Sequence, residues 1–442
     1  MKFLNQHVNP PRLLIFILFC FILLGTFLLK LPIATTHSIS WIDALFTAAS
    51  ATTVTGLAVI DTGSSFTLFG EIVILFLIQV GGLGIMSFAV LFFILLGKKI
   101  SFKERMLIQL ALNQTTLGGV IRLVLHLFLF SLIVEGIAVI LLAINWVPEF
   151  GWWNGIYVSI FHSVSAFNNA GFSIFTNNLM GYVSDPAVNL IISSLFIIGG
   201  IGFTVLLDIF QKRQWKNVSL HSKVMIVGTV LFNLFAVLLI FSLEYNNPNT
   251  LGNLSASGKI LGAFFQGVSP RTAGFNSIDI GSMETSSILF MILLMFIGAG
   301  SGSTGGGIKL TTFFVIVLAV ISFIKGRDDI TVFRRTIDKA IIFRSLAIAM
   351  ISTFIIFIAL FLLNLTERDT PFLHLLFEVV SAFGTVGLSM GVTGSLTSLG
   401  KLIIIFVMFI GNIGPLTLAF SLTKNKIIKI KYKLPKEDLL TG

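Results

Sequence analysis

The sequence contains few charged residues. Asp, Glu, Lys and Arg make up 11% of its 442 residues, whereas soluble domains carry about 25%. Hydrophobic residues make up 55%, and the mean hydropathy is +1.00. This composition excludes an ordinary soluble protein and indicates an integral membrane protein. We expect the apolar run from Leu13 to Leu29 to be a retained membrane helix rather than a cleaved signal peptide.

Cysteine is almost absent. The one cysteine, Cys20, lies inside an apolar run, which excludes an intrachain disulfide and a cysteine metal site. The six histidines are scattered and form no HExxH motif, and His126 and His162 stand alone in apolar surroundings. We therefore expect no catalytic residues, no enzymatic activity and no covalently bound cofactor.

The net charge of +10 is concentrated in particular loops. Basic residues gather in the segments 98–105, 212–223 and 325–344 and in the tail 423–442. Acidic residues gather in the alternate loops, among them Asp61, Glu149, Asp185, Glu244 and Glu367. Because positively charged loops stay on the cytoplasmic side of a membrane, this pattern places both termini in the cytoplasm. It predicts contacts with anionic lipid and no nucleic-acid partner.

Four segments of the sequence align without gaps: LFTAASATTVTGL, IFHSVSAFNNAGF, AFFQGVSPRTAGF and LFEVVSAFGTVGL. Each carries a phenylalanine ten residues before a glycine, and three carry a serine six residues before it. A second glycine motif follows each segment, at 81–84, 199–202, 298–307 and 411–414. Such recurrence indicates internal repeats. The glycines of the aligned segments are Gly56, Gly171, Gly274 and Gly387.

Each repeat divides into a leading helix, a segment too short to span about 30 Å of hydrocarbon, and a return helix. The apolar runs predict leading helices at 13–31, 120–145, 224–243 and 341–363, and return helices at 69–96, 187–210, 286–324 and 400–421. The short segments all lie on the acidic side, which is typical of re-entrant helices.

The predicted fold is an all-α integral membrane protein with four membrane–pore–membrane repeats. Eight transmembrane helices and four re-entrant pore helices would surround one central pore. The repeats are predicted to span residues 1–97, 98–212, 213–325 and 326–422, followed by a basic cytoplasmic tail at 423–442.

The glycine that ends each short segment has a physical reason. Backbone carbonyls replace the hydration shell of an ion only where the chain runs close to the pore axis, which glycine permits. No ring of Asp or Glu accompanies the glycines, and this favours monovalent over divalent cations. An ordinary helix C-cap also favours glycine, but four in register favour a filter. The predicted ligands are the backbone carbonyls of Thr53, Val54, Thr55, Gly56, Asn168, Asn169, Ala170, Gly171, Arg271, Thr272, Ala273, Gly274, Gly384, Thr385, Val386 and Gly387.

The second glycine motif is longest in the third repeat. It is not a phosphate-binding loop, because no Gly-Lys-Ser/Thr follows and it lies between apolar spans. Non-helical backbone at membrane depth must line water or pack against protein, so the motif predicts an intramembrane gating loop. Lys309 would either anchor this loop or extend to the membrane interface. The loop consists of Gly298, Ala299, Gly300, Ser301, Gly302, Ser303, Thr304, Gly305, Gly306 and Gly307.

Together, the motifs SATTVTGLAVIDTG, SAFNNAGFS, SPRTAGFNS, GAGSGSTGGGIKLTTF and SAFGTVGLSMG resemble the membrane subunit of Ktr-type bacterial potassium uptake systems, in the Trk/Ktr/HKT superfamily. The resemblance covers essentially the whole chain. It implies potassium uptake across the bacterial plasma membrane through one central pore, in a homodimer. The family's filter glycines fall on the four glycines of the aligned segments, and relatives with Ser at the first of them tend towards sodium.

The resemblance also implies a regulatory partner. A cytosolic ring of the RCK type would bind ATP and ADP, since this chain has no nucleotide-binding domain of its own. The basic loops and tail would be its docking surfaces.

One residue departs from the family pattern. Relatives usually carry Arg in a Gly-Arg-(Ile/Leu)-Gly setting of the fourth return helix, where this sequence has Asn412. A positive charge near the gate would bind loop carbonyls and repel cations, whereas Asn can only hydrogen-bond. We therefore include Asn412 among the predicted gate residues and expect a less tightly closed gate or an altered cation affinity.

Other functions compete with this prediction. A sodium-coupled potassium symporter or a less selective cation channel would use the same loops. A solute carrier usually has two inverted halves, and the scarcity of intramembrane acids such as Glu135 weakens proton coupling. An intramembrane hydrolase using Ser301 or Ser303 would need a facing histidine, and neither His126 nor His162 has an evident pairing with this loop.

Overall fold

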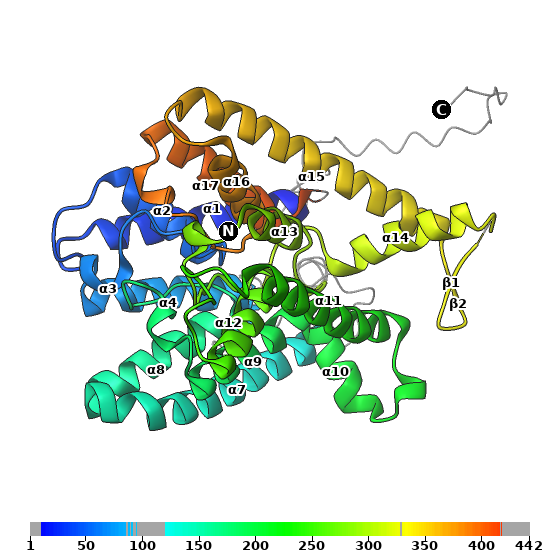
Figure 1. The fold of residues 1–442 in the computed structure, drawn as a ribbon, viewed down its shortest axis with the longest axis horizontal. Helices are drawn as coiled ribbons and strands as arrows, with labels where there is room; N and C mark the ends of the chain where they lie inside the picture. The colour runs from blue at the N-terminus through cyan, green and yellow to red at the C-terminus, as the bar shows by residue number, and fades with distance from the viewer. Residues whose placement is uncertain are drawn as a thin grey trace.

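The computed structural model of the chain describes residues 10–84, 87, 88, 90, 91, 94, 120–327, 329–415 and 417. Helices dominate these residues and pack side by side (Figure 1). They follow the predicted order of leading helix, short helix and return helix four times. The predicted basic segment 98–105, the first repeat boundary at 97 and 98, and the tail 423–442 lie outside the described residues.

The leading helices are the longest in the described part of the chain. Each is apolar and long enough to cross a membrane. Their positions agree with the predicted apolar runs, although the second extends further than expected. They are α1 (Pro10–Lys30), α7 (Val120–Phe150), α11 (Leu220–Glu244) and α15 (Lys339–Thr366).

The short helices, which we call the pore helices, have 12 to 16 residues and fall below the roughly 20 residues that a spanning helix needs. Each ends three to six residues before a motif glycine, as the sequence predicts. They are α2 (Trp41–Thr52), α8 (Trp152–Phe167), α12 (Ala256–Val268) and α16 (Phe372–Gly384).

The return helices are broken, and the prediction of continuous helices in repeats 1, 2 and 4 is wrong. Gly84, Gly202 and Gly414 have φ angles of 86°, 102° and 87°, which a helix does not permit. The chain bends by 89° at the second break. The return helices are therefore α4 (Leu68–Gly82), α9 (Pro186–Ile201) with α10 (Phe203–Lys212), α13 (Thr285–Phe296) with α14 (Leu310–Ile324), and α17 (Ser398–Ile413).

The repeats are arranged in a closed ring. The return helix of each repeat packs against the pore helix of the next: α4 against α8, α9 against α12, and α13 against α16. The last return helix, α17, packs against the first pore helix, α2. The first and last repeats thus lie beside each other, as the neighbouring blue α2 and orange α17 of Figure 1 show.

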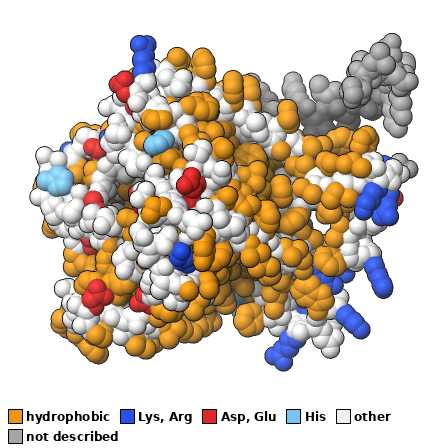
Figure 2. All heavy atoms as spheres, viewed as in Figure 1, with side chains coloured by type: hydrophobic (Ala, Val, Ile, Leu, Met, Phe, Trp, Pro, Cys, Tyr) orange, Lys and Arg blue, Asp and Glu red, His pale blue; other side chains and the backbone are white. Residues whose placement is uncertain are grey.

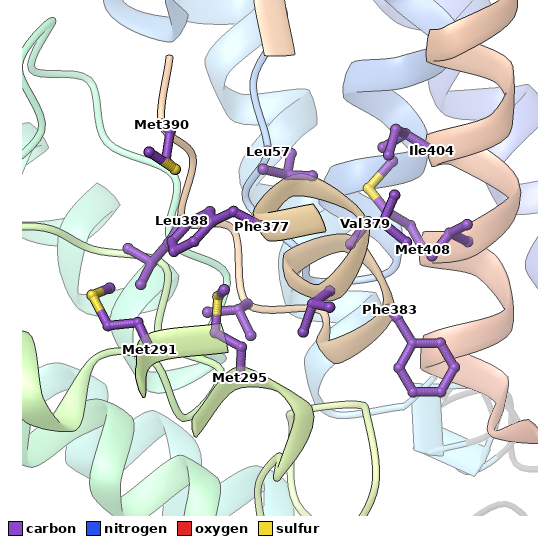
Figure 3. Packing of buried hydrophobic residues seen from close by; sticks show 14 of the residues in the cluster. Leu57, Met291, Met295, Phe377, Val379, Phe383, Leu388, Met390, Ile404 and Met408 are labelled. Atoms are coloured by element: carbon purple, nitrogen blue, oxygen red, sulfur yellow. The ribbon is translucent and has the colours of Figure 1, made fainter. Parts of the chain in front are cut away.

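The pore helices contribute the centre of the core. The repeated phenylalanine of the aligned segments is fully buried at Phe46, Phe161 and Phe377, whereas in the third repeat Phe265 is buried instead of Phe264. Figure 3 shows Phe377, Val379 and Phe383 of α16 packed among methionines and leucines of neighbouring segments. The repeated phenylalanine is therefore a packing residue.

The outer surface is apolar. On α15, Phe343, Met350, Phe354, Phe357 and Phe361 recur at helical spacing and are 58–73% exposed. Figure 2 shows hydrophobic side chains over much of the visible face, with Lys and Arg gathered at the end that carries α10 and the small hairpin β1–β2. Such a surface suits a lipid environment, and the charge separation is the one that the positive-inside pattern predicts.

A short hairpin of two strands and five short helices complete the described residues. The hairpin pairs β1 (Ile330–Val332) with β2 (Arg335–Ile337) in antiparallel register, Ile330 opposite Ile337. Its turn residues, Phe333 and Arg334, both have positive φ, as a type I′ turn requires. No pattern in the sequence predicted this hairpin. The other five elements are α3 (Thr62–Ser65), η2 (Met180–Tyr182), η3 (Trp215–Asn217), η4 (Ile280–Ser282) and η5 (Thr393–Ser395).

An ion pair closes the ring between the first and last repeats. Lys401 of α17 donates to Asp43 of α2 at 2.8 Å, and the two side chains are only 13% and 17% exposed. Ser40 also donates to the Asp43 carboxylate, at 2.6 Å, and caps the same helix. We call this pair the ring seam.

Replacing Lys401 with methionine leaves the Asp43 carboxylate without its ion-pair partner. We expect the free energy of unfolding to fall by about 1–3 kcal/mol, between the effects typical of exposed and of buried pairs. Thermal unfolding in detergent measures the loss. Lys212→Met is the matched control, because the Lys212 side chain is 41% exposed in its pair with Asp208. Equal losses in both variants would contradict the importance of the seam.

The seam also predicts a pH dependence. Burial acts to raise the pKa of Asp43, but the hydrogen bonds from Lys401 and Ser40 outweigh burial and hold the pKa below its ordinary value of 3.8. The contribution of Asp43 to stability is therefore complete above that value and is lost as the pH falls through the lowered pKa. The free energy of unfolding of Lys401→Met should therefore fall less in acid than that of the parent protein.

Candidate ion pathway

Each pore helix leads into a short loop that ends at a motif glycine. We call residues 53–56, 168–171, 271–274 and 384–387 the filter loops. The motif glycines have φ between 69° and 92°. Positive φ is costly for other residues and persists only where the surroundings enforce it, yet it occurs two positions before every motif glycine. We call these four residues the inner positions: Val54 (55°), Asn169 (59°), Thr272 (70°) and Thr385 (49°).

The filter loops meet in a closed ring at the motif glycines. No side chain fits there, because a methyl group added to any of the four would lie within 2.6 Å of the next loop. This close approach explains why glycine recurs at the same place in each repeat. The contacts are Gly56 to the carbonyl oxygen of Ala170 (2.3 Å), Gly171 to Gly274 Cα (2.6 Å), Gly274 to the carbonyl oxygen of Val386 (2.5 Å) and Gly387 to that of Thr55 (2.1 Å).

Serines at the ends of the pore helices hold the loops from behind. Ser50 accepts a hydrogen bond from the amide of Gly56 at 3.0 Å, and Ser381 accepts one from Gly387 at 3.2 Å. Ser165 donates to the carbonyl of Phe172 at 2.7 Å. In the third repeat Ser269 takes this place by donating to Phe275, although it lies one residue later than the aligned pattern. Sequence alignment without gaps missed Ser269 for that reason.

The electrostatic setting of the ring suits a cation. The C-terminal ends of the pore helices lead directly into the filter loops, and helix C-termini carry partial negative charge. Within the described residues, no group of three or more His, Cys, Asp or Glu side chains could hold a metal ion. The filter loops contain no Asp or Glu, so the oxygen atoms that they offer belong to backbone carbonyls, hydroxyls and side-chain amides rather than to carboxylates.

A cavity of about 380 Å³ opens on the outer side of the ring. Gly56 and Gly171 of the filter loops line it, together with the polar side chains of Asp61, Ser173 and Asn178. Its lining combines two ring glycines with Asp61, which belongs to a loop that the sequence predicts to be extracellular.

The predicted gating loop closes on itself between α13 and α14. Ile297 and Ile308 form an isolated parallel bridge, and the amide of Gly298 donates to the carbonyl of Ile308 at 2.8 Å. Lys309 donates from its ammonium group to the carbonyl of Gly305. Of the two roles open to Lys309 in the sequence, the structure therefore shows the anchor.

The gating loop lies against the broken return helix of repeat 2. The amide of Gly300 donates to the carbonyl of Gly200 at 2.8 Å, and that of Phe203 donates to Gly302 at 3.0 Å. A methyl group at Gly202 would lie 2.7 Å from the carbonyl oxygen of Ser301. Ser303 bonds within the loop, to the carbonyl of Gly300 at 2.7 Å. The break in the return helix thus makes room for the loop.

The loop also lies directly against the filter loops. Residues 304–308 are buried. A methyl group at Gly305 would lie 2.3 Å from Thr272 Oγ1, and one at Gly306 would lie 2.6 Å from Thr385 Oγ1. The structure therefore brings the predicted loop and the predicted filter together.

Two predicted residues differ from the expectation in what their side chains contact. Asn412 donates from Nδ2 to the carbonyl of Thr53 at 3.1 Å, so its side chain contacts a filter loop. Arg271 extends back to α11, where its Nη1 donates to Asn233 Oδ1 at 2.9 Å and its guanidinium lies 5.8 Å from the Phe232 ring centre. The positive charge of Arg271 is therefore held against the leading helix α11.

A buried polar cluster supports the second filter loop. Asn168 donates to Gln79 Oε1 at 2.6 Å, and Gln79 in turn donates to the Glu135 carboxylate at 3.2 Å. Sequence reasoning noted Glu135 but missed Gln79. The signal was its position as a lone polar residue within an apolar stretch of the return helix.

Comparison with known proteins gives consistent matches. The family model described as "TrkH: Cation transport protein" matches residues 17–429. The chain is 57% identical over 434 residues to the Ktr system potassium uptake protein B of Bacillus subtilis (strain 168), covering 98% of this chain and 97% of that protein. It is 44% identical over 438 residues to the protein of the same name from Vibrio alginolyticus, covering 98% and 95%.

A solved structure shares the fold. The crystal structure of the potassium transporter TrkH from Vibrio parahaemolyticus matches with a TM-score of 0.73 and 20% sequence identity, covering 95% of this chain and 86% of that one. The match confirms the predicted all-α membrane fold.

A ring of four loops inside an apolar helical protein, together with these matches, places the chain among ion transport proteins rather than among enzymes. The chain belongs to the TrkH family of cation transport proteins. Its relatives are transport proteins, which confirms that the chain is not an enzyme and confirms the resemblance to Trk and Ktr proteins.

The ring geometry predicts that Gly171→Ala is strongly destabilising. An alanine there would combine positive φ with an overlap against Gly274, and we expect a loss of about 3 kcal/mol. Gly136→Ala on α7 is the control, because a methyl group there meets nothing within 4 Å and alanine favours the helix. Thermal unfolding in detergent compares the two. Similar stability of both variants would contradict the ring.

Proposed function

We propose that this chain is the pore-forming subunit of a bacterial potassium uptake system, and that K⁺ crosses the plasma membrane through the ring of filter loops. The observation that carries the proposal is the closed ring of motif glycines, each pressed against the next loop. The two relatives at 57% and 44% identity are both named as potassium uptake proteins.

Backbone carbonyls of the filter loops would replace the water around the ion. The sixteen residues of the four loops supply these oxygens, and the pore helices add their negative C-terminal ends. The serine hydrogen bonds behind the loops would keep the carbonyls at fixed positions. A rigid ring of neutral oxygens binds a monovalent cation whose size fits the ring more favourably than a cation of a different size.

The gating loop would close the pathway on the inner side of the ring. Its residues 304–308 are buried beneath the filter loops. An ion leaving the filter toward the cytoplasm would have to pass this position, so the loop must move for transport to occur.

Regulation would come from a separate subunit. We propose a cytosolic ring of the RCK type that binds ATP or ADP and docks on the basic end of a homodimer of this chain. The name "Ktr system" of the relatives supports a multi-component assembly. The hairpin β1–β2 presents exposed Arg334 and Arg335 at the same end as the basic loops, which would be cytoplasmic together with both termini.

Flux measurements in liposomes test this function. Purified protein should conduct K⁺ in preference to Na⁺, and addition of the regulatory ring with ATP should raise the flux. Flux that requires both ions at once would instead establish a sodium-coupled symporter, and equal flux of both ions would establish a less selective cation channel. Absence of cation flux in every condition would refute the proposed pore.

The variant Gly56→Ser tests the filter. Gly56 has φ of 92°, and an added Cβ would lie 2.3 Å from the carbonyl oxygen of Ala170, so a serine must displace the ring. We expect the preference for K⁺ over Na⁺ to fall by roughly tenfold, corresponding to about 1.4 kcal/mol. Gly136→Ser on the surface of α7 is the control. An unchanged preference in Gly56→Ser would place the selective site elsewhere.

The variant Asn412→Arg tests the residue that departs from the family pattern. Asn412 holds the carbonyl of Thr53 with a neutral hydrogen bond, whereas arginine would add a fixed positive charge beside the pathway. We expect leak flux without the regulatory ring to fall several-fold relative to the parent, since a charge repels cations. Identical leak in both proteins would show that Asn412 does not influence closure.

A further inference from the structure

Two of the four inner positions hydrogen-bond the gating loop through their side chains. These four residues are equivalent in backbone conformation but differ in chemistry: Val54, Asn169, Thr272 and Thr385. All four are fully buried. A polar side chain that is fully buried needs a hydrogen-bond partner, and the partners here are in the gating loop or in a neighbouring inner position.

Asn169 binds the loop through its side chain. Its Oδ1 accepts a hydrogen bond from Thr304 Oγ1 at 2.9 Å, and its Nδ2 donates to Thr272 Oγ1 at 3.2 Å. Thr304 is only 4% exposed. The Asn169 amide therefore links the loop to inner positions of both repeat 2 and repeat 3.

Thr385 binds the loop from the opposite side. Its Oγ1 accepts a hydrogen bond from the backbone amide of Gly306 at 2.8 Å. The close approach is possible because Gly306 has no side chain, since an added methyl group would lie 2.6 Å from the same oxygen. The loop is thus bonded to the filter loops at two points, two residues apart in its own sequence.

Repeat 1 provides an internal comparison. Its inner position is Val54, which has no polar atom in its side chain to offer the gating loop. Its φ of 55° is close to the 49° of Thr385, so valine is compatible with this backbone conformation. The side chains of valine and threonine have nearly the same shape. The hydroxyl of Thr385 is therefore not required to form the filter backbone.

We propose that Asn169 and Thr385 latch the gating loop to the inner end of the filter, so that the pathway opens only when both hydrogen bonds break. The proposal rests on the proposed pore function for its consequence in transport, but the latch itself is a structural claim. It makes the two side chains positioning residues for the loop, in addition to any role of their carbonyls.

Part of the free energy that keeps the gating loop in its closed position then comes from side chains of the filter loops. Buried hydrogen bonds of this kind are not replaced by water while the loop stays dry, so their loss shifts the balance toward the displaced loop. The position of the loop and the side chains of the filter loops would then depend on each other.

Thr385→Val and Thr304→Val test the latch, because each removes one hydroxyl and keeps the shape of the side chain. We expect each to raise K⁺ flux without the regulatory ring by roughly fivefold, and the double variant to raise it by roughly the product. Thr47→Val is the matched control. Thr47 is buried in α2, and its hydroxyl bonds only the carbonyl of Asp43 at 2.9 Å.

A second measurement does not depend on transport. In a Cys20→Ser background, Ser303→Cys places the only thiol in the gating loop. A water-soluble thiol reagent should label this cysteine several-fold faster when Thr385→Val or Thr304→Val is also present, because the loop leaves its site more often. Thr47→Val should not change the labelling rate.

The combined outcomes separate the two proposals. Faster labelling with increased flux and unchanged preference for K⁺ supports the latch. Faster labelling in a protein that conducts no cation in any condition supports the latch and refutes the pore. Unchanged labelling and flux in a conducting protein refutes the latch alone. Increased flux with lost ion preference and unchanged labelling would show that Thr385 supports the filter instead of the loop, and would also overturn the latch.

Discussion

The contact between four glycines and the backbone of the next filter loop is the constraint on which the rest of the structure depends. Nothing larger than hydrogen fits at these positions, so the glycines have no side chain that could hold their own loops in place. Hydrogen bonds to serines at the ends of the pore helices hold the loops instead. The pore helices must converge on one point and are buried by the return helix of the preceding repeat. Backbone groups at this depth also need partners, which the ring, the serines and the gating loop provide for one another.

The fourfold arrangement holds for the backbone and not for the side chains. The inner positions share a positive φ, yet they carry valine, asparagine and two threonines. Within the described residues, only repeat 3 has a long loop between its return helices, and this loop contacts repeats 2 and 4 through Asn169 and Thr385. Repeat 1 instead receives Asn412 on the carbonyl of Thr53. The repeats keep the ring through what they share, whereas the proposed control of the pathway depends on where they differ.

The repeats, the pore helices and the filter loops could be predicted because they are marked by local pattern. A stretch of about twelve residues between two apolar runs on the acidic side of a membrane has few structures open to it. The breaks at Gly84, Gly202 and Gly414 were not predictable in this way. A glycine within an apolar run is equally compatible with close packing of an intact helix, and only the space needed by neighbouring segments, such as the gating loop beside Gly202, distinguishes the two.

By itself, the sequence determined the membrane class, the fourfold repeat, the separation of charge between alternate loops and the glycines of the ring, since each follows from hydrophobic length, loop charge or a recurring residue. The tertiary structure alone decided which side chains meet. Asn169 and Thr304 are 135 residues apart, Asp43 and Lys401 are 358 apart, and Thr53 and Asn412 are 359 apart. These pairs form because the repeats close into a ring in a particular order, and that order is a property of packing between repeats which no pattern within one repeat encodes.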